Sequence, residues 1–181
     1  VYCGNRISRY QIDNLSVREL VWKGPTDRRF RLSADGKRAG GEFPHPKAGM
    51  AYLPNHGWRQ YGDGCNSMLA PDNSYRFFHM LGNHVEIAMY DDGGINRRLI
   101  PVQPQGIKGP CWIPKWSNDV RFLTLTAPLV DGKGDIYIGQ FDDKFTAVTK
   151  WIQVSSLPRQ NTYAYAWIEP GLGQESGKAP F

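Results

Sequence analysis

Apolar residues along this chain come in short runs, separated by clusters of Gly, Asp, Asn and Pro. No long stretch places apolar residues at positions i, i+3, i+4 and i+7, which is the pattern of an amphipathic helix. The runs are instead rich in β-branched and aromatic residues, and several alternate apolar with polar positions. Such runs between turn signals are typical of short antiparallel strands, so the pattern predicts an all-β fold.

The runs also repeat. Three stretches, 31–43, 68–80 and 115–127, share a Ser- or Ala-containing pair, an acidic turn and a strand. Aligning Asp35, Asp72 and Asp119 gives spacings of 37 and 47 residues. A second half-repeat, with two strands around a polar turn, recurs at 84–102 and 135–154, and 5–21 is a third copy of it.

A period of roughly 40 residues with four short strands per unit is the pattern of a β-propeller blade. The repeats divide the chain into outer strands of a blade (1–22), three successive blades (23–60, 61–103 and 104–155), an innermost strand of a closing blade (159–168) and a C-terminal tail (169–181). This makes about four blades of four-stranded antiparallel sheet, the smallest usual ring. The alternative is part of a larger ring, whose remaining blades lie on a missing segment or on another chain.

The repeat resembles the TolB-like, WD40-like (PD40) family of β-propeller repeats. The matching residues are Pro114, Trp116, Ser117, Asp119 and Phe122 in the first half and Ile136, Tyr137, Ile138 and Asp142 in the second. The resemblance implies structural roles: the turn aspartate accepts backbone N–H bonds, and the tryptophan packs between blades. The stretches 116–128, 136–154 and 161–171 also resemble secreted bacterial modules related to TolB, often joined to carbohydrate-associated domains. That resemblance implies a periplasmic or extracellular location.

Composition and charge narrow the function classes. The chain has 181 residues, 40% of them hydrophobic, and a net charge of +5. Its Lys and Arg residues are scattered, whereas a nucleic-acid-binding protein gathers them on one face, so we expect no nucleic-acid partner. No apolar stretch is long enough to span a membrane. The three cysteines, Cys3, Cys65 and Cys111, lack C-x-x-C spacing, which leaves one disulfide plus a thiol, or three thiols.

The stretch 77–86 holds the strongest candidate for a metal site. His79 is expected to end one strand and His84 to begin the next, so that both imidazoles could point to the same side of a hairpin and bind a metal ion. A third ligand would have to come from another blade, from His45 or His56. The other reading is a pair of loop histidines that form hydrogen bonds. Beyond this metal ion, no cofactor is expected.

Other catalytic patterns are weaker. No G-x-S-x-G nucleophile elbow is present. The pairs Asp91-Asp92 and Asp142-Asp143 occupy equivalent turns of the repeat, which favours turn formation over acid–base catalysis. The stretch 130–137 has too few oxygen ligands for a calcium loop, which favours a connecting loop.

Three tryptophans near predicted loops or strand ends, Trp58, Trp112 and Trp167, are candidate stacking platforms for a glycan. Packing between blades is the competing role for each. Together these features predict a non-catalytic scaffold that binds a protein or a glycan, or joins blades on another chain. The alternative is a subunit or fragment of a propeller-based enzyme, a polysaccharide lyase or a multisubunit redox complex, with a metal at the histidine hairpin.

Overall fold

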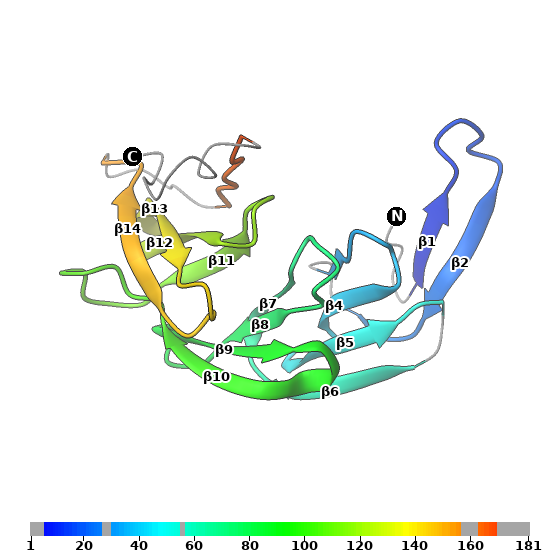
Figure 1. Ribbon diagram of the computed structural model, residues 1–181, viewed down its shortest axis with the longest axis horizontal. Helices are drawn as coiled ribbons and strands as arrows, with labels where there is room; N and C mark the ends of the chain where they lie inside the picture. The colour runs from blue at the N-terminus through cyan, green and yellow to red at the C-terminus, as the bar shows by residue number, and fades with distance from the viewer. Residues whose placement is uncertain (1–5, 27–29, 55–56, 157–162, 170–181) are drawn as a thin grey trace.

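The computed structural model describes residues 6–26, 30–54, 57–156 and 163–169 (Figure 1). Its strands are β1 (Arg6–Tyr10), β2 (Arg18–Lys23), β3 (Arg31–Leu32), β4 (Arg38–Glu42), β5 (Lys47–Tyr52), β6 (Trp58–Asp63), β7 (Cys65–Leu69), β8 (Phe77–Met80), β9 (Glu86–Asp91), β10 (Ile95–Pro101), β11 (Trp112–Trp116), β12 (Phe122–Val130), β13 (Lys133–Phe141) and β14 (Val148–Gln153). The only helical element in the described part of the chain is a short 3-10 turn, η1 (Asp92–Gly94). The predicted all-β fold is confirmed.

The strands form three four-stranded antiparallel sheets and one two-stranded sheet. We call them the first blade (β3–β6), the second blade (β7–β10), the third blade (β11–β14) and the half-blade (β1–β2). Within each sheet every strand pairs with the next one in the chain. The boundary that the repeats place after residue 60 falls inside β6, which ends at Asp63. Gly64 alone then connects β6 to β7.

The sheets follow one another along an arc (Figure 1). The strands β7 and β11 lie toward the hollow of the arc, while β6, β10 and β14 run along its outer side. The strand β3 contacts β7, and β7 contacts β11, so the first strands of the three blades are neighbours. This arrangement brings together residues that lie far apart in the sequence.

The repeated aspartate turns have the predicted geometry. The carboxylates of Asp35, Asp72 and Asp119 each accept a hydrogen bond from the backbone N–H two residues later, at 3.0, 3.1 and 3.0 Å. This is an Asx turn, in which the side chain replaces a backbone acceptor. The same local interaction therefore ends the first strand of each blade in the same way.

Each junction between neighbouring sheets is filled by apolar side chains. Adjacent residues of a strand point to opposite faces of its sheet. Thus Phe77 packs toward the first blade and Phe78 toward the third, and both are fully buried. A third core joins the half-blade to the first blade, with Trp22 packed edge-on against Phe43. The second blade is consequently buried on both faces.

Trp116 lies in the core between the second and third blades. It is 3% exposed, and its ring centroid is 5.0 Å from that of Phe78 and 5.3 Å from that of Phe141. The predicted interblade packing of this tryptophan is confirmed.

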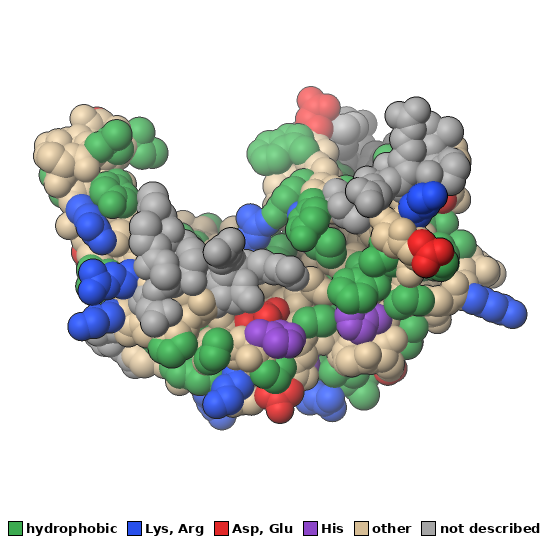
Figure 2. Space-filling view, turned by 180° about the vertical axis from the view of Figure 1, so that it is seen from behind, with side chains coloured by type: hydrophobic (Ala, Val, Ile, Leu, Met, Phe, Trp, Pro, Cys, Tyr) green, Lys and Arg blue, Asp and Glu red, His purple; other side chains and the backbone are tan. Residues whose placement is uncertain are grey.

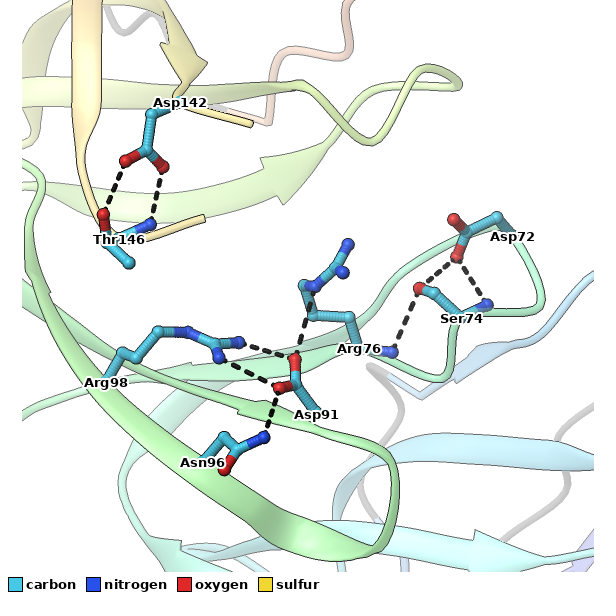
Figure 3. A network of polar contacts seen from close by, with 8 residues as sticks. All are labelled: Asp72, Ser74, Arg76, Asp91, Asn96, Arg98, Asp142 and Thr146. Carbon is cyan, nitrogen blue, oxygen red and sulfur yellow. Dashed lines mark hydrogen bonds and ion pairs between the residues drawn. The ribbon is translucent and has the colours of Figure 1, made fainter. Parts of the chain in front are cut away.

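A polar network holds the outer hairpin of the second blade (Figure 3). Both carboxylate oxygens of Asp91 accept hydrogen bonds from Arg98, at 2.6 and 3.0 Å, and Arg76 lies 3.6 Å away. The guanidinium of Arg76 lies 3.7 Å from the ring centroid of Phe145 in the third blade. The hydrogen bonds from Arg98 are the main reason that the pKa of Asp91 falls to about 2. The equivalent Asp142 instead accepts from the backbone N–H of the turn residue Thr146, at 2.6 Å.

In the described part of the chain, no helix is long and apolar enough to cross a membrane. Cys111 is a free thiol, and Cys3 lies outside the described residues. Burial raises the pKa of the Cys111 thiol to about 12. Cys111 is therefore an apolar core residue.

Replacing Trp116 by alanine should destabilise the protein by about 3–5 kcal/mol, because the change leaves a large cavity between two blades. Urea unfolding at neutral pH measures the effect. The matched control is Trp167→Ala, the same change at a side chain that is 77% exposed, which should shift stability by less than about 0.5 kcal/mol. Equal effects of the two changes would contradict this view of the core.

The stabilisation from Asp91 should depend on pH. Its folded-state pKa lies below the ordinary value of 3.8, so the stabilisation is present above that value and is lost as the pH falls toward 2. Asp91→Asn should lower the free energy of unfolding at neutral pH by about 1 kcal/mol, since the pair is partly solvated. The variant should then lose less stability than the wild type between these two pH values. Asp92→Asn, at the exposed neighbouring carboxylate, is the control for the change in net charge.

Candidate ligand-binding site

The first strands of the three blades converge on two adjoining cavities of about 540 and 290 Å³. We call these two cavities together the axial pocket. Residues from all three blades and from the segment 163–167 line it: Phe30, Arg31, Leu32, Asn66, Ser67, Met68, Leu69, Pro71, Ile113, Pro114, Lys115, Trp116, Ser117, Asn118, Tyr163, Tyr165, Ala166 and Trp167. In a propeller, the strands nearest the axis and the loops at their ends are where ligands have access.

The segment 163–168 closes one side of the pocket. Ile168 is hydrogen-bonded through both backbone groups to the side chain of Asn118, at 2.7 and 2.8 Å. The hydroxyl of Thr124 donates to the carbonyl of Ala164 at 2.8 Å. Side chains of the third blade therefore hold this segment by its backbone. Residues 159–162 of the predicted inner strand lie outside the described residues, and 163–168 belong to no sheet.

The aromatic side chains of this segment point away from the sheet that holds it. Tyr163, Tyr165 and Trp167 are 58%, 56% and 77% exposed, whereas Ile168 is 9% exposed. Exposed residues alternate with less exposed ones along the segment. The result is an aromatic ledge, made of Tyr163, Tyr165 and Trp167, along one side of the axial pocket.

Two cations lie against this ledge. The guanidinium of Arg31 is 4.7 Å from the ring centroid of Tyr165, and the ammonium of Lys115 is 3.9 Å from the same centroid. Both distances fall within the range of cation–π contacts. Burial lowers the pKa of Arg31 from its ordinary value, yet a guanidinium keeps its charge at neutral pH.

Of the three tryptophans expected to contact a ligand, only Trp167 lines the axial pocket. Trp58 begins the outer strand β6 and packs 5.7 Å from the ring of Phe43. Trp112 begins β11 and lies 4.2 Å from the imidazole of His84. The contacts of these two tryptophans are with other aromatic groups of the fold.

The hairpin geometry expected for the histidines is wrong. Residue 79 pairs with Ala88 across the strands β8 and β9, while His84 lies in the turn with a φ of 55°. The turn is longer than expected, because β8 ends at Met80 and β9 begins only at Glu86. The two imidazoles therefore do not occupy opposite positions of a ladder.

The two imidazoles also have different surroundings. His79 is 1% exposed, and its imidazole stacks on the ring of Tyr90. The Tyr90 hydroxyl is 3.3 Å from Nε2 of His79, and burial lowers the pKa of His79. The Nε2 atom of His84 is 3.8 Å from the sulfur of Cys65. His45 contacts the carboxylate of Glu42 at 3.0 Å, and His56 lies outside the described residues. Within the described residues, no group of three or more His, Cys, Asp or Glu side chains is placed to hold a metal ion.

The sequence motifs do not predict the two cations, although the repeats contain a signal for them. Arg31 and Lys115 each precede the turn aspartate of their repeat by four residues. Met68 has the same place in the second blade. Equivalent positions of a repeat face the same side, so aligning the repeats by their aspartates identifies a set of residues that faces the axis.

No protein-family model matches the chain, and no curated protein is detectably similar to it in sequence. Solved structures are similar in fold. One assigned as TolB from Agrobacterium tumefaciens has a TM-score of 0.60 and 14% identity over 86% of this chain and 57% of that one. An oligogalacturonate lyase in complex with manganese has a TM-score of 0.57 and 16% identity, over 86% and 49% of the two chains.

TolB from Acinetobacter baumannii has a TM-score of 0.54 and 18% identity over 84% of this chain and 39% of that one. The chain thus spans about half the length of the solved structures that it matches. At these identities the likeness shows the fold alone. The sheets described above are blades of a TolB-like β-propeller fold.

Proposed function

We propose that this chain is a non-catalytic propeller module that binds a protein or a glycan, in the bacterial envelope or outside the cell. The observation that carries the proposal is the axial pocket with its aromatic ledge. Aromatic side chains that stay exposed beside a cavity provide a large contact area that is already in place before binding. Likeness in fold to two TolB structures supports the proposed location.

The open end of the arc supports a protein partner or further blades. The half-blade exposes apolar side chains along its hairpin: Ile12, Leu15, Val17 and Leu20 are 94%, 69%, 48% and 43% exposed. Figure 2 shows apolar side chains gathered on this arm, beside the hollow of the arc. Exposed apolar patches of this kind mark surfaces that another protein covers.

Glycan binding at the axial pocket would depend on Trp167. We expect Trp167→Ala to weaken binding of a saccharide by about tenfold or more, because the loss of one stacking ring costs on the order of 1–2 kcal/mol. Isothermal titration calorimetry with cellohexaose as a neutral probe and an oligomannuronate hexamer as an acidic probe measures the change.

Trp58→Ala and Trp112→Ala are matched controls, since they remove the same side chain outside the pocket. Circular dichroism confirms that each variant is folded at the temperature of the titration. If neither saccharide binds the wild-type protein, glycan binding at this pocket is excluded.

The alternative function, a propeller enzyme with a metal at His79 and His84, makes a different prediction. It requires stoichiometric metal in protein equilibrated with Mn²⁺ or Zn²⁺, and loss of that metal in His84→Ala. The different surroundings of the two imidazoles lead us to expect no stoichiometric metal. Inductively coupled plasma mass spectrometry of the wild-type protein and of His84→Ala measures the bound metal and decides between the two functions.

A further inference from the structure

The repeat-equivalent positions that face the axis differ in charge from blade to blade. Arg31 in β3, Met68 in β7 and Lys115 in β11 all precede their turn aspartate by four residues, and all three line the axial pocket. Two of these three positions carry a cation. The pocket therefore contains two positive charges, contributed by the first and third blades.

Among the described residues that line the axial pocket, none is Asp or Glu. The buried carboxylate of Glu42 contacts a residue of the lining, because it accepts a hydrogen bond from the backbone N–H of Ser67 at 3.4 Å. Its other oxygen is 3.0 Å from Nδ1 of His45. The side chain of Lys115 is almost fully withdrawn from water, with only 6% of the residue exposed.

Cations in such a setting attract an anion more strongly than surface cations do, because less water screens them. A hydrogen bond between charged partners also contributes more than a neutral one. The rings of the aromatic ledge lie against the same two cations, since both are over the ring of Tyr165. An anionic group held by Arg31 and Lys115 would therefore lie beside an aromatic face.

We propose that the axial pocket selects an acidic saccharide, whose carboxylates pair with Arg31 and Lys115 while its sugar rings stack on Tyr165 and Trp167. This inference rests on the proposed function, and it specifies the ligand of that pocket. A uronic acid has both required features, a carboxylate and a ring with an apolar face. An acidic peptide has the carboxylate but not the ring, so the exposed aromatic ledge favours the saccharide.

The test compares an oligomannuronate hexamer with its fully methyl-esterified form by isothermal titration calorimetry. Esterification keeps the rings and removes the charge, so we expect binding to weaken by about tenfold or more. Arg31→Gln should weaken binding of the acid by a similar factor and leave binding of the ester unchanged. Raising the salt concentration from 50 to 500 mM should weaken binding of the acid and leave binding of the ester unchanged.

Arg59→Gln is the matched control, because it makes the same chemical change on the exposed outer strand β6. Lys115→Gln tests the second cation. If this variant fails to fold because Lys115 is buried, Arg31→Gln alone tests the proposal. Equal affinity for acid and ester, with Trp167→Ala weakening both, would overturn the inference and leave the proposed function standing. Binding of hexaglutamate as tight as that of the acid would overturn the inference in favour of an acidic peptide. Failure of every saccharide to bind would overturn the inference and glycan binding at this pocket, and would leave protein binding as the proposed function.

Discussion

Packing of one sheet face on the next is the interaction on which the rest of this structure depends. A four-stranded sheet with apolar side chains on both faces is not stable by itself, because its buried residues need cover on either side. The second blade has that cover: Phe77 packs toward the first blade and Phe78 toward the third, and each is withdrawn from water. The same constraint places Trp116 between blades, whereas apolar residues of the half-blade stay exposed where no further sheet in the described part of the chain covers them.

The arc positions the axial pocket. The Asx turns at Asp35, Asp72 and Asp119 end the first strand of each blade with the same local geometry. Residues four positions before these turn aspartates therefore face the axial pocket. There Arg31 and Lys115 contact the ring of Tyr165. The faces between blades are apolar, and two of the three positions that precede the turn aspartates by four residues carry a cation.

The histidine hairpin shows where local reasoning reaches its limit. The sequence places His79 and His84 five residues apart between two strand-forming runs, and a tight hairpin would set them opposite each other. The structure ends β8 at Met80 and uses a longer turn, so His79 belongs to the buried strand and His84 to the turn. Both strands are buried on both faces, so their mostly apolar residues form continuous runs without alternation, and such runs do not show where the strand ends and the turn begins.

The amino-acid sequence by itself determined the all-β class and the repeat of four strands, which follow from the short apolar runs between turn residues. The resemblance of the repeats to the TolB-like family implied the structural roles of Trp116 and the turn aspartates. Only the tertiary structure decided which side chains meet at the axis. Arg31, Lys115 and Tyr165 are far apart in the chain, and they come together because three blades and the segment 163–168 converge there. The contacts that make up a binding site depend on the packing of whole sheets, which no short stretch of sequence encodes.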